Sequence, residues 1–497
     1  MDRIRLRAFL RPVLAALMVS AVLSPAAVAQ TATNQSGDDA SVAAPLLPNV
    51  YCFSGSPLLL QVNVPDPKHS LAAVRIDSGT SSMAYSIPDD PEREALQLYV
   101  SPFLGPGLYE LDIELETGEG VVSRSNLDVG FVDFVWGRDN LSFGNNSEYA
   151  SVIGTFGEIL AEWITARFGE IDEADLVLLV NYMYGLFGRN TGRCYAFSGT
   201  EVRYWRWPDL LPSYYDSAHD LRGNVARYQR EMNFLQFDIV FDHFLAGPGS
   251  EQILHPMSRR QIEEQVAQIE DHIAAGEPVA VGFAGPDLHH SMLVFGFIRN
   301  RTTHTVDLLV ANNWKNDEKL NIHSRDAEII RLFLDPGHEG PVAQWRYEEG
   351  VRNREIDRLF VVDVPRDAYG HERTLLDGLT ASLRKQLDSE GHAIVVVEEA
   401  AGARLVDGES STGRIRNRIT EELEDVWYER VGKSYRFTYP AGLPLELEIA
   451  DVGGARVLTA APGPDPGVII AAVQVTEAAP EGATVTRRLP LPGAVSE

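Results

Sequence analysis

Cys194 stands where a glycine-containing loop gives way to a predicted helix, in the run Asn190-Thr191-Gly192-Arg193-Cys194-Tyr195-Ala196-Phe197. Gly192 lets the chain turn sharply into that helix. The unpaired amides of a helix N-terminus, together with the charge of Arg193, lower the pKa of a thiol and favour the nucleophilic thiolate. The pattern therefore indicates a cysteine nucleophile. The alternative is a buried cysteine or a disulfide with Cys52, since the chain has two cysteines.

A predicted β-hairpin supplies a candidate base and a group to orient it. Strands at 291–298 and 305–311 flank a polar turn, and if the turn centres on Arg301 the opposed residue numbers sum to 602. In this register His290 faces Asn312 on one face of the sheet, with Cβ atoms about 5 Å apart. An imidazole beside an amide is held in one orientation, as a general base requires.

The neighbouring residues leave two alternatives open. His289 would face Asn313 on the other face of the sheet, and a one-residue slip of register would mix the two pairs. A metal site would need more ligands, but no second histidine lies at i+2 or i+4 from this histidine pair and no further cysteine is available. We therefore predict no metal and no other cofactor.

Three segments carry a resemblance to a known family. His290-Ser291-Met292-Leu293-Val294-Phe295-Gly296-Phe297 is similar to the His-Ala-Val-x-x-x-Gly-Tyr strand of the papain-like cysteine peptidases, and Asn312-Asn313-Trp314 is similar to their Asn-Ser-Trp. Gly192-Arg193-Cys194-Tyr195-Ala196-Phe197 resembles the helix-opening cysteine of bacterial relatives, including the double-glycine-cleaving branch. The order Cys, His, Asn matches as well, and the resemblance covers about residues 140–365.

The resemblance implies an α+β fold and a role for each of three residues. Cys194 would be the nucleophile, His290 the general base, and Asn312 the residue that fixes the imidazole. A glutamine precedes the cysteine in papain-like enzymes and helps to hold the oxyanion, whereas residues 186–193 contain none. Asn190 is therefore the candidate oxyanion donor, with the backbone amide of Cys194 as a further donor. Bacterial relatives often carry Asp at the position of Asn312.

The first 29 residues have the pattern of a secretory signal peptide. An apolar core at 13–23 precedes the small-residue cleavage site Ala27-Val28-Ala29. The positive region before the core comprises Arg3, Arg5, Arg7 and Arg11. The small, polar segment 30–46 predicts a disordered leader. We therefore expect a secreted or periplasmic protein that does not insert into a membrane.

Three structured domains are predicted after the leader. Short alternating runs separated by Pro and Gly at 47–132 favour an immunoglobulin-like β-sandwich. Helical stripes followed by strands at 140–365 favour the papain-like α+β domain. A leucine-spaced helix and then Val/Ile-rich strands at 370–497 favour a C-terminal β-rich domain. The predicted fold class is thus multidomain, with β, α+β and mostly β parts in that order.

The net charge of −28 is the main compositional constraint on partners. No long basic run offsets it, so nucleic acid and anionic membrane surfaces are not expected as partners. A protein or peptide substrate is expected instead. Aromatic side chains crowd the segment 182–207, where helical spacing favours a core role over a substrate cleft.

Three functions follow from these residues. The first is a secreted papain-like cysteine hydrolase that cleaves peptide or isopeptide bonds through Cys194, His290 and Asn312. The second is a non-catalytic binding protein in which a decayed papain-like core serves as a spacer. The third keeps the thiol chemistry but changes the acceptor, as in transglutaminase-like acyl transfer or the processing of cell-wall amides.

Overall fold

A computed structural model provides the coordinates. The residues that it describes are 49–53, 59–65, 70–79, 82–88, 95–100, 105–135, 137–143, 156–187, 193–221, 225–246, 255–286, 288–313, 329–335, 337–338, 340–346, 353–367, 370, 373–415, 418–431, 434–451, 454–465, 468–477 and 484–491. The predicted signal peptide, the leader, Asn190 and Trp314 lie outside these ranges.

The chain forms two compact units, each built from several segments. Unit 1 comprises Met1–Asn145, Phe197–Arg222 and Gly247–Arg366, and unit 2 comprises Asn146–Ala196, Gly223–Ala246 and Asp367–Glu497. The division falls inside one helix, α4 (Cys194–Arg206). The predicted domains are contiguous segments, so they group the chain differently, and their boundaries stay a prediction.

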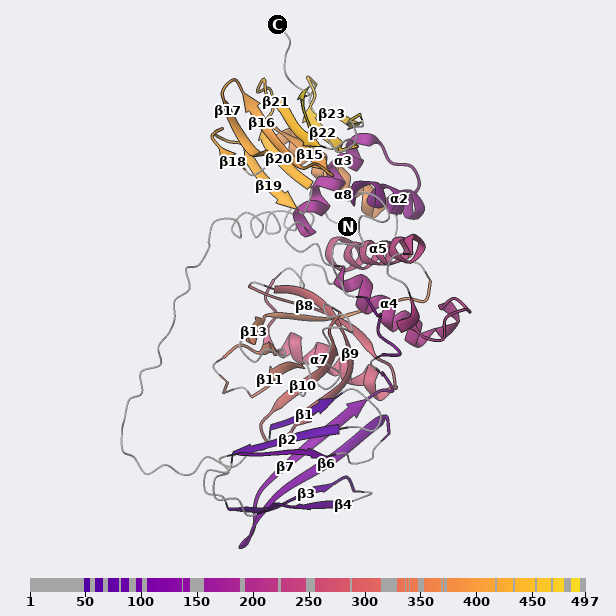
Figure 1. Ribbon diagram of the computed structural model, residues 1–497, viewed down its shortest axis with the longest axis vertical. Coiled ribbons are helices and arrows are strands. Elements are labelled where there is room, and N and C mark those ends of the chain that lie inside the picture. Colours follow the sequence, from indigo (N-terminus) through magenta and orange to yellow (C-terminus); the bar gives the residue numbers. More distant parts are fainter. Residues whose placement is uncertain are drawn as a thin grey trace, which may run out of the picture. The chain divides into compact units, whose positions relative to one another are not determined.

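Unit 1 is dominated by an 11-stranded sheet in which every pairing is antiparallel. Its main path is β13-β12-β11-β10-β9-β7-β6-β3-β4, and β8 joins β14 to β9 beside this path (Figure 1). The strands are β3 (Leu71–Asp77), β4 (Ser82–Ser86), β6 (Gly107–Thr117), β7 (Gly120–Phe131), β8 (Val279–Gly285), β9 (Leu288–Asn300), β10 (Thr305–Ala311), β11 (Ile329–Phe333), β12 (Ala343–Arg346), β13 (Asn353–Ile356) and β14 (Arg358–Val362).

The N-terminal strands are divided between two sheets. β7 pairs with β9 from Leu127↔Asn300 to Phe131↔Gly296, so β3, β4, β6 and β7 continue the sheet of the central segment. Three other strands, β1 (Asn49–Phe53), β2 (Leu59–Pro65) and β5 (Ala95–Val100), form a separate antiparallel sheet. The predicted β content is therefore confirmed, whereas the long β7–β9 pairing differs from the free-standing sandwich that the local pattern favours.

Helix α7 (Arg259–Ala274) packs against β14 and β9 of this sheet (Figure 1). It begins at a capping box, in which Ser258 accepts from the Gln261 backbone amide and the Gln261 side chain accepts from Ser258 N–H. Its buried residues are Ile262, Val266, Ile269 and Ile273. These four residues recur at helical spacing and form the apolar face of the helix.

Unit 2 combines helices with a C-terminal β-sandwich. The helices are α2 (Phe156–Phe168), α3 (Glu173–Phe187), α5 (Ala226–Val240) and α8 (Arg373–Glu390). One five-stranded sheet has the order β19-β20-β15-β22-β23, and the other has the order β18-β17-β16-β21-β24. The strands are β15 (His392–Glu398), β16 (Gly402–Asp407), β17 (Ser410–Ile415), β18 (Arg418–Glu421), β19 (Trp427–Val431), β20 (Ser434–Pro440), β21 (Glu446–Asp451), β22 (Arg456–Pro462), β23 (Ile469–Val475) and β24 (Val485–Pro490).

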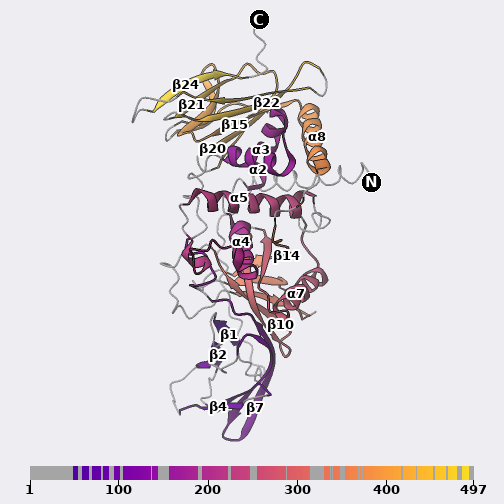
Figure 2. The same ribbon diagram turned by 90° about the vertical axis from the view of Figure 1, so that its right-hand side faces the viewer.

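One apolar core lies between these two sheets. It takes Val395 from β15 and Phe437 from β20 on one side, and Leu405 from β16 and Ile449 from β21 on the other, all nearly or fully buried. Helices α3 and α8 pack against the β15-containing sheet (Figure 2). The prediction of a C-terminal, mostly β region with a leading helix is therefore confirmed.

A buried carboxylate joins α2 and α3 to the sandwich. Glu398 accepts hydrogen bonds from the Gly157 backbone amide at 2.8 Å and from the Tyr184 hydroxyl at 2.7 Å, and it lies 3.5 Å from Arg456. A Cβ at position 157 would lie 2.8 Å from Glu398 Oε2, so a larger residue there would require the Glu398 carboxylate to shift. This cluster of four residues is called the Glu398 node below.

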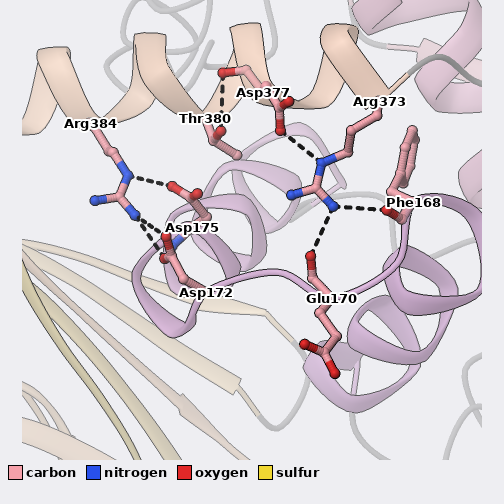
Figure 3. Close-up of polar contacts among 8 residues, drawn as sticks. All are labelled: Phe168, Glu170, Asp172, Asp175, Arg373, Asp377, Thr380 and Arg384. Atoms are coloured by element: carbon pink, nitrogen blue, oxygen red, sulfur yellow. Dashed lines mark hydrogen bonds and ion pairs between the residues drawn. The ribbon is translucent and has the colours of Figure 1, made fainter.

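Two arginines attach α8 to the connection between α2 and α3 (Figure 3). Arg373 donates to the carbonyl oxygens of Phe168 and Glu170, each at 2.8 Å. Three helical turns later, Arg384 donates to the carboxylates of Asp172 and Asp175. Together these contacts place α8 beside α3 within unit 2.

Candidate functional site

The β9–β10 hairpin brings together two of the predicted site residues. His290 lies within β9, and Asn312 directly follows β10. Their side chains are hydrogen bonded, with 3.2 Å between His290 Nε2 and Asn312 Oδ1. Both residues are buried, with exposed fractions of 0% for His290 and 6% for Asn312.

The register that produces this pair differs from the predicted one. The turn occupies 301–304, and Asn300 pairs with Thr305, so opposed residue numbers sum to 605 rather than 602. At an odd sum His290 and Asn312 would point to opposite faces of the sheet. The predicted register is therefore wrong, although the predicted pair of side chains is correct.

A β-bulge in β9 restores the common face. Leu309 pairs with Gly296 but Val310 pairs with Val294, so Phe295 is the extra residue and the sum becomes 604. Asn312 and His290 are then diagonal neighbours on one face, within reach of a hydrogen bond. The bulge is anchored outside the hairpin, because Val132 N–H donates to the Phe295 carbonyl at 2.9 Å and the ring of Phe295 stacks on Phe134.

Aromatic side chains surround the His290 imidazole. Phe283, which is directly opposite on β8, has its ring centroid 5.6 Å away, and Trp345 on β12 has its centroid 5.5 Å away. Burial in these surroundings lowers the pKa of His290 to about 3. The hydrogen bond to Asn312 raises this pKa but does not offset the effect of burial. The imidazole is therefore neutral at physiological pH.

The hydrogen bond also fixes which nitrogen carries the proton. An amide oxygen can only accept, so Nε2 of His290 must be the donor and Nδ1 holds the lone pair. A neutral imidazole in this tautomer is a proton acceptor at Nδ1. This geometry is compatible with the expected roles of Asn312 and His290, which stay predictions.

The neighbouring histidine and asparagine are arranged differently. Asn313 Nδ2 donates to the backbone carbonyl of Ser291 at 3.1 Å. Burial, and then the charge of Arg358, lower the pKa of His289 to about 4. The hydrogen bond of Asn313 to the strand thus anchors the segment that carries Asn312.

Cys194 is the first residue of α4, where the sequence predicts it. It is a buried thiol with an exposed fraction of 8% and forms no disulfide within the described part of the chain. The side chain of Cys52 lies outside that part. Cys194 belongs to unit 2, whereas His290 and Asn312 belong to unit 1. The structure therefore gives the geometry of the His290–Asn312 pair within unit 1, and the place of Cys194 in the triad stays a prediction.

Helix α5, which the sequence analysis did not predict, supplies the surroundings of Cys194 within unit 2. Gln236 Oε1 accepts from the Ala196 backbone amide at 2.9 Å and so satisfies one of the free amides at the start of α4. The Arg193 guanidinium donates to Gln229, and burial lowers the pKa of Arg193 to about 10. An apolar stripe did signal this helix at Tyr228, Met232, Leu235 and Ile239.

Farther along α4, two polar side chains are buried within unit 1. The Ser198 hydroxyl lies 2.6 Å from the hydroxyl of Ser291, the residue after His290. Glu201 Oε1 accepts from the Leu141 backbone amide at 3.1 Å, whereas its Oε2 is buried and has no hydrogen-bond partner within the described residues. Burial raises the pKa of Glu201 to about 8, partly opposed by the Leu141 bond. No sequence pattern pointed to Glu201.

The aromatic residues near the cysteine are mainly core residues, as the spacing favours. Tyr182, Tyr184, Tyr195 and Phe197 are buried, whereas Tyr204, Trp205 and Trp207 are partly exposed.

In the part of the chain that the structure describes, no cluster of three or more His, Cys, Asp or Glu side chains could hold a metal ion. No helix in that part is long and apolar enough to cross a membrane.

A scan against models of protein families finds no match, and a search of curated proteins finds none either.

Proposed function

We propose that this protein is a secreted or periplasmic papain-like cysteine hydrolase that cleaves peptide or isopeptide bonds. The observation that carries the proposal is the hydrogen bond from His290 Nε2–H to Asn312 Oδ1 at 3.2 Å. It leaves the lone pair on Nδ1, as a general base requires. Cys194 at the start of a helix provides the nucleophile, because helix-terminal amides favour the thiolate.

In the proposed reaction His290 Nδ1 accepts the proton of the Cys194 thiol while sulfur attacks the carbonyl carbon. The tetrahedral intermediate collapses to a thioester, and the leaving amine takes the proton from the imidazolium. Water, deprotonated by His290, then attacks the thioester and releases the acid and the thiol. Asn312 acts through His290 and is a positioning residue.

Two features of α4 support this assignment. The helix carries Cys194 as its first residue, where helix-terminal amides favour the thiolate. Gln236 brings a side-chain amide to the first turn of α4. Its Nε2 is a candidate oxyanion donor in addition to Asn190, which lies outside the described residues. The same proposal includes a papain-like fold for the central region and an immunoglobulin-like fold for the N-terminal strands.

Burial favours a second candidate function, a non-catalytic binding protein. His290 has no exposed surface and Cys194 is 8% exposed, so a substrate carbonyl reaches them only if covering residues move. A decayed core would retain the His290–Asn312 hydrogen bond for stability alone. The two functions differ in whether Cys194 reacts.

Alkylation and turnover separate these functions. The purified chain is treated with iodoacetamide at mildly acidic pH, and a library of fluorogenic peptides is screened in parallel. We expect Cys194 to be labelled before Cys52, and His290→Ala to slow labelling and turnover about 10²–10⁴-fold. Cys194→Ala should abolish turnover, whereas Cys52→Ala serves as the matched control and should retain it. Full turnover by Cys194→Ala would refute the hydrolase, and an inert Cys194 without turnover would favour the binding protein.

A further inference from the structure

A cavity of about 200 Å³ lies in unit 1 at the C-terminal end of α4. Tyr204 and Trp205 of α4 line it together with Leu211, Arg138, Asp139 and Asp216. The indole is held in place, because Trp205 Nε1–H donates to the Asp133 carbonyl at 3.2 Å. Pockets for drug-sized ligands measure about 300–1,000 Å³. This cavity therefore has room for a single small group.

The charges that line the cavity do not cancel. Arg138 is neutralised by Asp139, to which its guanidinium donates at 2.8 and 2.7 Å, and this hydrogen bonding raises the pKa of Arg138. Asp139 also accepts from Val135 N–H at 2.7 Å. Asp216 is exposed and has no hydrogen bond or ion pair within the described residues. One negative charge thus remains in a lining that also contains Tyr204 and Trp205.

We propose that this cavity binds a small organic cation, either the guanidinium or ammonium group of a basic peptide side chain or a free amine with the same head group. Aromatic faces attract cations through their quadrupoles, and Asp216 adds a carboxylate partner. The net charge of −28 raises the local concentration of cations near the protein and disfavours anionic ligands. The site does not depend on the proposed hydrolase chemistry.

Two isosteric probes test the charge requirement on the full chain. N-acetyl-arginine amide carries the cation, and N-acetyl-citrulline amide has nearly the same shape without it. Binding is followed by tryptophan fluorescence and by saturation-transfer NMR at millimolar probe. We expect saturable binding of the arginine probe and at least threefold weaker binding of the citrulline probe. Equal binding of the two probes, or no saturable binding of either, would overturn the proposal.

Substitutions locate the site. Asp216→Asn should lower the affinity for the arginine probe about threefold to fivefold, which is the range expected for an exposed ion pair. Added salt should lower this affinity by a similar factor. Glu119→Gln makes the same change of charge in the exposed β6–β7 turn, outside the cavity lining, and should change nothing. Trp205→Leu should also weaken binding. If Asp216→Asn and Glu119→Gln behave alike, the cavity is not the cation site.

A third probe distinguishes the two sources of the cation. A blocked tripeptide with a central arginine presents the same side chain with additional backbone. Tighter binding of this tripeptide than of the arginine amide supports a peptide side chain as the occupant. Equal affinity supports a free organic cation that is recognised by its head group alone.

Discussion

His290 in unit 1 and the Glu398 node in unit 2 are two buried polar sites that are satisfied in different ways. Glu398 is 1% exposed and is bonded by a backbone amide, a tyrosine hydroxyl and an arginine. His290 is 0% exposed and lies between two aromatic rings, with Asn312 as the partner of Nε2. The first arrangement stabilises a charge, and the second keeps a base neutral.

This difference separates a structural role from a chemical one. Three donors converge on one carboxylate and join α2, α3 and β22 to the end of β15, so loss of Glu398 removes an acceptor that all three share. An imidazole oriented through one nitrogen still has a basic nitrogen to offer. The node is therefore a structural contact within unit 2, whereas the His290–Asn312 pair is the more informative site for function.

The largest expected effect is on the Glu398 node. Glu398→Ala would remove the acceptor of the Gly157 amide and the carboxylate beside Arg456, and it would leave the Tyr184 hydroxyl with Ser434 alone. Removing one partner of a buried pair costs about 3–5 kcal/mol. Urea unfolding should show this loss, whereas Glu409→Ala, at an exposed position in the β16–β17 turn, should stay within about 0.5 kcal/mol of the wild type. Similar values for both variants would mean that the node is not structural.

The pH dependence of stability tests the His290 side of the comparison. The folded pKa of His290 is about 3, below the ordinary 6.5, so the unfolded state binds more protons between these values. Stability should therefore fall as the pH drops from 6.5 towards 3, by up to about 1.4 kcal/mol per pH unit. His290→Asn should reduce this slope, and His304→Asn, an exposed turn residue with φ 52°, should not. Equal slopes in both variants would contradict the burial of a neutral His290.

Glu201 is an intermediate case, a buried carboxyl with one bonded oxygen. Its folded pKa of about 8 lies above the ordinary 4.5, so the folded state binds more protons between these values. Stability should therefore fall as the pH rises from 4.5 to 8, the opposite sign to His290. Glu201→Gln should reduce the dependence of the unfolding free energy on pH in this range by up to about 1.4 kcal/mol per pH unit. Thermal unfolding across pH checks the effect, with exposed Glu119→Gln as the control.

Local patterns in the sequence predicted the parts of the fold that local interactions decide. The ends of α4 follow from the cysteine-bearing loop and from Pro208, and the start of α7 follows from the Ser258–Gln261 capping box. The hairpin is predictable because two largely apolar runs flank a polar turn. Its register differs for two reasons: the turn occupies 301–304 and does not centre on Arg301, and the bulge at Phe295 is held by Val132 and Phe134, which lie far away in the sequence.

Long-range pairing accounts for the other differences. The β7–β9 ladder joins residues near 130 to residues near 297, and no local pattern encodes such a partner. Glu201 is buried because α4 packs beside Leu141, which a helical pattern alone does not reveal. Helix α5 was a different kind of miss, since its stripe from Tyr228 to Ile239 was present in the sequence.

The smallest expected effect is at the surface, where solvent replaces lost partners (Figure 3). The Arg384 side chain is 28% exposed and pairs with Asp172 at 2.6 Å. Its other partner is Asp175, whose pKa is raised by burial, whereas the hydrogen bond and charge of Arg384 lower it. Arg384→Ala should cost only about 0.5–1 kcal/mol in urea unfolding, and Lys385→Ala, the exposed neighbour, should cost less. Asp172→Ala should cost more than Arg384→Ala, because Asp172 also accepts from the Asp175 amide at the start of α3. A loss at Arg384 as large as that at Glu398 would show that exposure does not decide the strength of these contacts.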